Sequence, residues 1–238
     1  PGGALAGSGP GGAAGDSSSG GALGGSGSAG VPLEIALIAG PLDLPAAVAR
    51  IAGEPAVRLV AVEMPVAADA AQARSTVRAM RETLPPEVST AVELPRTGRR
   101  DEVLDVLAGA GCRAKLRTGG LRADLFPPVG ELAATIRACT GRGVAFKCTA
   151  GLHHAIAHRD PATGFAHHGF LNVLLAAARP DDAEDQLRRT DSAAIAAEVR
   201  DCAGARSVFT SFGTCDVGEP VDDLIGLGLL PASERLTA

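Results

Sequence analysis

Residues 112–151 read CRAKLRTGGLRADLFPPVGELAATIRACTGRGVAFKCTAG, and the pattern in this stretch is the starting point for the fold. Two short runs with strand character, 112–120 and 144–151, enclose a segment near 130–139 with the spacing of a helix. A strand, a helix and a second strand in this order favour parallel strands joined by a right-handed crossover. The stretch therefore predicts one unit of an α/β sheet.

The same alternation continues on both sides of this unit. Further strands are predicted at 33–40 (a buried strand), 57–65, 88–95 and 207–213, and further helices at about 44–51, 68–84, 100–110, 169–179, 183–201 and 221–229. A complete (β/α) barrel needs eight strands, and only six are clear here. The pattern predicts an α/β fold, either a (β/α) barrel or an incomplete TIM-like barrel with parallel strands.

Composition divides the chain into two regions. Residues 1–30 are almost entirely Gly, Ala, Ser and Pro, a mixture that cannot bury enough apolar surface to offset its ordering entropy. We expect a disordered tail at 1–30 and an α/β-barrel-like domain at 31–238. The hydrophobic content of 46% is sufficient for a full core.

Charge and cysteine content limit the classes of partner. The net charge of −5 and the lack of basic runs argue against nucleic acid and anionic membranes. No apolar run approaches the roughly 18 residues that suggest a membrane span. Five cysteines without CxxC spacing suit reduced thiols, so we expect a cytoplasmic protein. A homo-oligomer is compatible with these features.

The lysines are the first candidate functional residues. Of the 22 Lys and Arg residues only Lys115 and Lys147 are lysine, and each lies near the end of a predicted strand. Two amines that point into one barrel mouth disfavour each other's charge, and burial adds to this, which lowers the pKa of one of them. A neutral lysine attacks carbonyl carbons and forms Schiff bases. The alternative is that both lysines are ion-pair partners of Glu63 and Glu93.

Polar residues also end the other predicted strands. Glu63, Glu93 and Ser211 accompany the two lysines in this position. Barrels and open α/β sheets place their functional sites at the C-terminal ends of strands. The strand ends are therefore the expected location of the site.

Three motifs resemble class I aldolases of the deoxyribose-phosphate type. They are KLRTGG at 115–120, FKCTAG at 146–151 and SFGTCD at 211–216, in the order in which those enzymes carry similar strand ends. The resemblance implies that Lys115 forms the Schiff base and that Lys147 tunes it, or the reverse, and that the last turn holds a phosphate. Arg117 stands where those enzymes have a small residue.

A closer resemblance, over about residues 33–230, is to a bacterial protein family without assigned function. That family carries KxRTGG, FKxTAGLHH, HGFLN and SFGxC motifs, which stand here at 115–120, 146–154, 168–172 and 211–215. The resemblance implies a shared site but no particular reaction.

All five histidines lie between His153 and His168. Imidazole is a common ligand of divalent metals, so one alternative is a metal-dependent hydrolase or isomerase that uses this cluster. A second is acid–base catalysis, in which His154 and His168 move protons while Lys115 holds the substrate. Asn172 would then bind a substrate oxygen. A third alternative is a polar loop without a chemical role.

Backbone N–H groups near Arg117 could bind an anion. Gly119 and Gly120 follow this arginine, and Gly213 precedes the last predicted helix.

We expect an aldolase-like lyase that needs no cofactor and acts on a small anionic carbonyl compound; a non-catalytic anion-binding protein is a further alternative. The candidate catalytic residues are Lys115, Lys147, His154, His168 and Glu93, and the candidate substrate-binding residues are Arg117, Thr118, Gly119, Gly120, Thr149, Asn172, Ser211 and Gly213.

Overall fold

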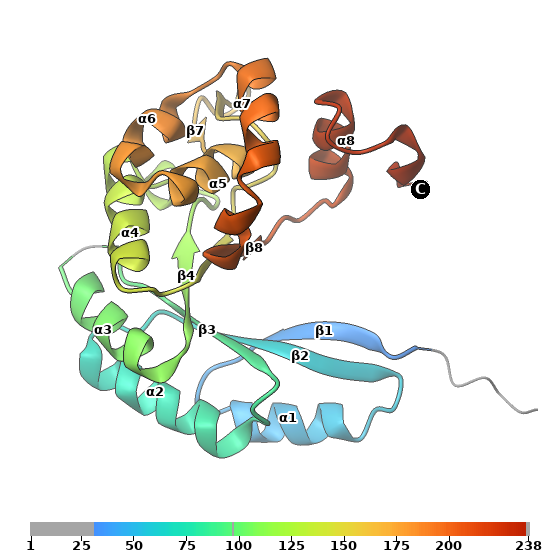
Figure 1. Ribbon diagram of the computed structural model, residues 1–238. Coiled ribbons are helices and arrows are strands. Elements are labelled where there is room, and N and C mark those ends of the chain that lie inside the picture. The colour runs from blue at the N-terminus through green and yellow to red at the C-terminus, as the bar shows by residue number, and fades with distance from the viewer. Residues whose placement is uncertain (1–30, 97, 237–238) are drawn as a thin grey trace, which may run out of the picture. The chain divides into compact units, whose positions relative to one another are not determined.

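Six strands form one parallel sheet in the computed structural model, which describes residues 31–96 and 98–236 (Figure 1). The predicted tail at 1–30 lies outside the described residues. Every neighbouring pair of strands in this sheet is parallel. The strands, in their order across the sheet, are β1 (Leu33–Ile38), β2 (Val57–Met64), β3 (Ser89–Glu93), β4 (Arg113–Arg117), β5 (Phe146–Thr149) and β8 (Phe209–Phe212).

The predicted α/β class is confirmed, and the described sheet curls into a half-barrel with β1 and β8 at its edges. Helices lie between successive strands, as the alternation in the sequence predicts. They are α1 (Leu44–Ala52), α2 (Ala70–Thr83), α3 (Arg100–Ala110), α4 (Val129–Gly141), α5 (Phe170–Ala178), α6 (Ala183–Arg188), α7 (Ser192–Glu198) and α8 (Gly218–Gly226).

The two faces of the sheet differ because successive strand residues point to opposite sides. On β4, Ala114 and Leu116 are buried in the hydrophobic core, where they join apolar residues of the helices such as Leu104 and Ile136. Lys115 and Arg117 point to the opposite side, which we call the polar face. The core therefore lies between the helices and one face of the sheet.

The prediction of a buried strand at 33–40 is wrong. β1 is an edge strand, and Leu33 and Ile38 are each 68% exposed. An edge strand lacks a neighbour on one side, so an apolar sequence alone does not bury it.

The single helix predicted at 183–201 is also wrong, because α6 and α7 are separate. Arg189 is extended at the end of α6, and Asn172 Nδ2 donates to the carbonyl oxygens of Gln186 (2.8 Å) and Arg189 (2.9 Å). The last carbonyls of a helix have no partner within it. A side chain from α5 therefore stabilises the end of α6.

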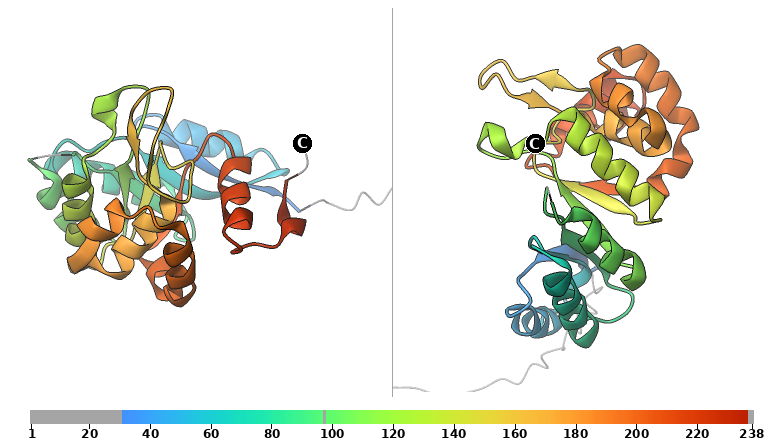
Figure 2. Two further views of the ribbon diagram at one scale, coloured as in Figure 1. Left: turned by 90° about the horizontal axis from the view of Figure 1, so that it is seen from above. Right: turned by 90° about the vertical axis from the view of Figure 1, so that its left-hand side faces the viewer.

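A short hairpin forms within the histidine segment. Its strands are β6 (His158–Arg159) and β7 (Ala166–His167), which pair antiparallel. The hairpin extends beside the turn at Ala123–Leu125 (Figure 2), and the ring centroids of Phe126 and His167 are 4.5 Å apart.

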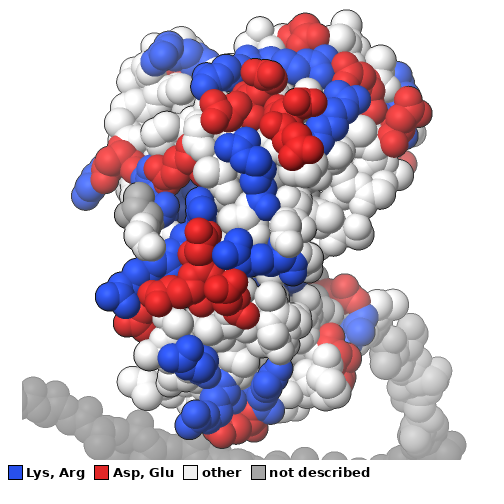
Figure 3. Space-filling view, turned by 60° about the vertical axis from the view of Figure 1, so that its left-hand side comes forward, with Lys and Arg blue, Asp and Glu red and all other residues white. Residues whose placement is uncertain are grey.

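Ion pairs connect α4 and the residue that follows it to neighbouring elements near the surface. Arg142 Nε is 2.7 Å from Asp105 Oδ1, and Arg96 Nε is 2.6 Å from Glu131 Oε1. Figure 3 shows basic and acidic side chains interspersed over the face that it draws. Exposed pairs of this kind each contribute only about 0–1 kcal/mol. No helix of the described residues has the length and apolar character needed to cross a membrane.

Candidate functional site

The register of the sheet aligns four of the strand-end residues. Glu93 on β3 pairs with Lys115 on β4, Lys115 pairs with Lys147 on β5, and Lys147 pairs with Ser211 on β8. Neighbouring strands are about 4.8 Å apart, so Glu93, Lys115 and Lys147 form one row across the polar face. The prediction that the two lysines lie side by side on parallel strands is confirmed.

Glu63 and Glu93 bind the two lysines. Lys115 Nζ lies 3.1 Å from Glu93 Oε2 and 3.6 Å from Glu63 Oε2. Lys147 Nζ contacts the other oxygen of Glu63, Oε1. Arg117 Nε donates to Glu93 Oε1 at 2.9 Å. These five residues are called the lysine site below.

Four of these five charged residues are buried. Lys115 is 4% exposed, Glu63 5%, Glu93 8% and Lys147 9%. A buried charge is costly unless it is paired and hydrogen-bonded, and here every one of the four has an ionic partner. The contacts are those that the ion-pair alternative predicts. They also bring the two amines close together, which the Schiff-base alternative requires.

Sequence reasoning named Glu63 only as a strand-end residue and ion-pair partner, not as a candidate catalytic residue, and it missed Arg113. Arg113 precedes Lys115 by two residues and so lies on the polar face; its Nη1 donates to Thr210 Oγ1 at 3.1 Å. Its buried Nε has no partner among the described residues. Burial lowers the pKa of the Arg113 guanidinium, and the charge of Glu63 opposes this effect. The only signal in the sequence was a charged residue within an apolar strand.

Two strand-end loops pack closely beside the lysine site. Thr118 Oγ1 donates to the carbonyl oxygens of Ala150 and Thr149, the latter at 3.3 Å. A Cβ atom on Gly119 would lie 2.8 Å from Gly151 Cα, and Gly151 has a φ of +77°. Glycine is needed at both positions, because a side chain has no room in this contact.

The other four candidate substrate-binding residues at the strand ends do not share one environment. A Cβ atom on Gly120 would lie 2.4 Å from Leu125 Cδ1, which indicates a packing role. Gly213 N–H donates to the Cys148 carbonyl oxygen at 3.0 Å, so it is engaged within the protein. Thr149 uses its carbonyl oxygen to accept from Thr118 N–H at 3.0 Å. Ser211, the register partner of Lys147, is exposed, and the neighbouring Thr210 is the β8 residue that contacts Arg113 on the polar face.

His168 and Asn172 contact backbone groups. His168 is 5% exposed, and its Nε2 is 2.8 Å from the Pro127 carbonyl oxygen. Burial lowers the pKa of His168, although the Pro127 carbonyl partly opposes this. Asn172 is fully buried, and its Oδ1 accepts from Ala157 N–H at 2.8 Å. Together with the bonds of Asn172 to α6, these contacts indicate structural roles.

Backbone hydrogen bonds from the HGFLN motif hold the preceding loop against the start of α5. Phe170 N–H donates to the His154 carbonyl oxygen (3.1 Å), and Leu171 N–H donates to that of Ala155 (3.0 Å). A Cβ atom on Gly169 would lie 2.4 Å from Ala155 O. The carbonyl groups of the preceding loop therefore accept from the first N–H groups of the helix.

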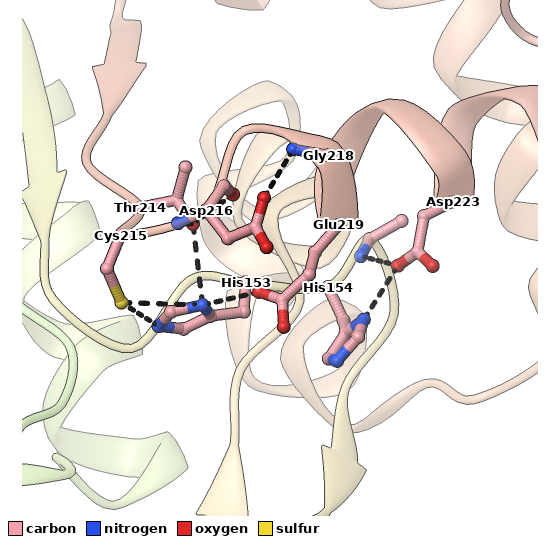
Figure 4. Close-up of polar contacts among 9 residues, drawn as sticks. His153, His154, Thr214, Cys215, Asp216, Gly218, Glu219 and Asp223 are labelled. Carbon is pink, nitrogen blue, oxygen red and sulfur yellow. Dashed lines mark hydrogen bonds and ion pairs between the residues drawn. The ribbon is translucent and has the colours of Figure 1, made fainter. Parts of the chain in front are cut away.

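The rings of His153 and His154 have different partners on the segment around α8 (Figure 4). His153 Nδ1 is 2.7 Å from Glu219 Oε2, whereas His154 Nδ1 is 3.2 Å from Asp223 Oδ2. Asp223 Oδ2 also accepts from Ala155 N–H at 2.7 Å. The predicted acid–base residue His154 thus pairs with a carboxylate of α8.

The other two histidines form an aromatic cluster. The ring centroids of His158 and His167 are 5.0 Å apart, and both residues line a pocket of about 540 Å³ together with Phe126, Phe165 and His168. Burial, followed by the charge of His158, lowers the pKa of His167. Among residues 31–96 and 98–236, no three His, Cys, Asp or Glu side chains are grouped so that they could hold a metal ion.

Comparison of the sequence with protein-family models and with curated proteins found no match. The function is therefore inferred from the contacts of the lysine site.

Proposed function

We propose that this chain is an aldolase-like lyase that acts on a small anionic carbonyl compound through a Schiff base on Lys115. The observation that carries the proposal is the contact of Glu63 with both amines, Lys115 at Oε2 and Lys147 at Oε1. One shared carboxylate holds two amines close together at the C-terminal ends of neighbouring strands. This is the location of active sites in barrel enzymes, and the half-barrel provides an incomplete TIM-like scaffold for it.

The contacts of Lys115 support its role as the nucleophile. Lys115 transfers a proton to Glu93, whose Oε2 is 3.1 Å away, and its free amine adds to the substrate carbonyl carbon. Glu93 returns the proton to the oxygen that leaves as water, and an iminium ion forms. The iminium withdraws the electron pair of the bond between its α and β carbons as that bond breaks, and the β-hydroxyl, which becomes the carbonyl of the leaving aldehyde, gives its proton to Glu93. Protonation of the resulting enamine and hydrolysis regenerate the amine.

In this scheme Lys147 is held by Glu63 Oε1 and takes no part in Schiff-base formation. From its position beside Lys115 on the next strand, it donates a hydrogen bond to the substrate hydroxyl or carboxylate.

An excess of positive charge supports an anionic substrate. Three guanidinium or ammonium groups, those of Lys115, Arg117 and Lys147, face the two carboxylates of Glu63 and Glu93. Arg113 adds a fourth cation on the same face of β4. The Arg117 side chain is 34% exposed, so it is the member of the lysine site that is best placed to meet a substrate from solvent.

Borohydride trapping tests the proposal. The protein is incubated with a panel of aldehydes and 2-keto acids, reduced, digested and mapped by mass spectrometry. Because the chain has only two lysines, an adduct can be assigned without ambiguity. We expect the reduced adduct on Lys115. Lys115→Arg should abolish it, whereas Lys147→Arg, the matched control, should retain it at a lower rate.

Failure of every compound in the panel to label Lys115 would refute the lyase proposal. Equal labelling of native and urea-unfolded protein would also refute it, because the reaction would then not need the site.

The burial of the ionic groups favours a second candidate, a non-catalytic anion-binding protein. All four buried charges already have partners within the site. This candidate predicts that small dicarboxylates or phosphate raise the melting temperature, that Arg117→Gln removes the effect, and that borohydride gives no adduct.

A further inference from the structure

Cys215, His153 and Glu219 form a second cluster with the geometry of a nucleophilic site, which we call the thiol site (Figure 4). Cys215 Sγ is 3.4 Å from His153 Nε2, and His153 Nδ1 is 2.7 Å from Glu219 Oε2. A nucleophile, a base within hydrogen-bonding distance and a third group that orients the base are the three parts of such a site.

Hydrogen bonding determines the tautomer of His153. A carboxylate can only accept, so the neutral imidazole donates its Nδ1–H to Glu219 Oε2. Nε2 then carries the lone pair, and Cys215 Sγ lies beside the ring, 3.4 Å from Nε2 and 3.9 Å from Nδ1. The imidazole is therefore within reach of the thiol, and a rotation of either side chain brings the thiol proton in line with Nε2.

The loop that carries Cys215 is held by local hydrogen bonds. Thr214 Oγ1 donates to the Asp216 carbonyl oxygen at 2.8 Å, and Gly218 N–H donates to Asp216 Oδ1 at 2.7 Å. Glu219 follows directly in the first turn of α8. The three members of the thiol site thus come from the loop after β5, the loop after β8 and the start of α8.

Cys215 differs from the other cysteines in its access to solvent. Cys112, Cys139 and Cys148 are buried, Cys202 is half-buried, and Cys215 is exposed. Burial raises the pKa of Cys139 to about 12 and raises that of Cys148 still further. Buried thiols of this kind are inert, whereas an exposed thiol next to a base is reactive.

We propose that Cys215 is the nucleophile of an acyl-transfer site that takes activated esters or thioesters. His153 Nε2 removes the thiol proton, and Sγ adds to the acyl carbon. The tetrahedral adduct expels the alcohol or thiol, which receives the proton from His153, and a thioester on Cys215 remains. A water molecule, deprotonated by His153, then releases the carboxylic acid and restores the thiol. None of these steps uses the lysine site.

An aryl ester such as p-nitrophenyl acetate is a suitable probe. We expect a burst of nitrophenol and an acetyl group that maps to Cys215. Cys215→Ser should abolish the burst. His153→Gln should slow it by about 100-fold or more, which is the scale of general-base catalysis. Glu219→Gln should cause a smaller loss, because Glu219 orients His153 and does not itself touch the acyl group.

Two controls test whether the burst comes from the thiol site. Cys202→Ser should keep the burst, since Cys202 lies outside the thiol site. The peptide map should also show no acetyl group on Lys115 or Lys147, which distinguishes acylation of Cys215 from reaction at the lysine site. Alkylation by iodoacetamide in the same variants, with a circular dichroism spectrum of each, gives a second measurement that does not depend on turnover.

The proposal is overturned if the acetyl group is spread over Cys202 and Cys215, or if His153→Gln leaves the burst rate unchanged. Fast alkylation of Cys215 without any acylation would likewise exclude acyl transfer.

Discussion

Glu63→Gln should lower the free energy of unfolding by about 3–5 kcal/mol, the cost of breaking a buried ion pair by removing one partner. Glu63 is 5% exposed and contacts both Lys115 and Lys147. Glutamine keeps the size of the side chain but not its charge. Lys147, which is 9% exposed, would then lose the anion that holds it.

Urea denaturation at pH 7, followed by circular dichroism, measures this loss. Glu34→Gln is the matched control, because Glu34 pairs with Arg58 where the two side chains are 55% and 62% exposed. Its cost should stay at about 1 kcal/mol or less. The double variant Glu63→Gln, Lys147→Met removes both charges and should recover part of the lost stability.

A loss below about 1 kcal/mol for Glu63→Gln, equal to that of the control, would refute the reasoning. The lysine site would then be hydrated in solution, and its ion pairs would not be desolvated as the structure indicates.

Three further predictions concern packing, pH and the loop that docks on α5. Gly119→Ala should lower the free energy of unfolding by about 1–3 kcal/mol, because the new Cβ would lie 2.8 Å from Gly151 Cα. Gly109→Ala in α3, where nothing lies within 4 Å of the new Cβ, should raise it by up to about 1 kcal/mol. Thermal melts of both variants test this. The pKa of His168 is lowered from 6.5 in the folded state, so the unfolded chain takes up the proton first. The free energy of unfolding should therefore fall as the pH drops below 6.5. His168→Gln should flatten this pH dependence in urea titrations between pH 7.5 and 5, and an unchanged slope would contradict the prediction. Asn172→Ala should lower the free energy of unfolding by about 2–4 kcal/mol, since it removes hydrogen bonds to Ala157 N, Gln186 O and Arg189 O. Amide hydrogen exchange should then become faster at 152–157 and at the end of α6.

Much of the lysine site follows from the sequence. The strand–helix–strand pattern of 112–151 correctly indicated that Lys115 and Lys147 occupy neighbouring parallel strands. Glu63 was harder to place. In a flat sheet, β2 and β5 are three strand spacings, or about 14 Å, apart. The contact between Glu63 and Lys147 exists because the sheet curls toward the polar face, and strand patterns carry no information about curvature.

The histidines show why clustering in sequence does not bring residues into one shared site. Adjacent residues in a loop direct their rings apart, and the partners of His153 and His154 come from α8, more than 60 residues later. His168 and Asn172 lie on a predicted helix, but their hydrogen bonds to Pro127, Gln186 and Arg189 depend on how the helix packs. The motif around them therefore resembles a chemical site in the sequence, but in the structure its residues hold the loop and the neighbouring helices together.

The most direct test of the central claim compares the two amines within one protein. After borohydride reduction in the presence of a reactive keto acid, the modified fraction at each lysine is quantified from its own peptide. The account predicts substantial modification of Lys115, loss of that modification in Glu93→Gln, and little at Lys147. Modification of neither amine, or of both to the same extent, would contradict it.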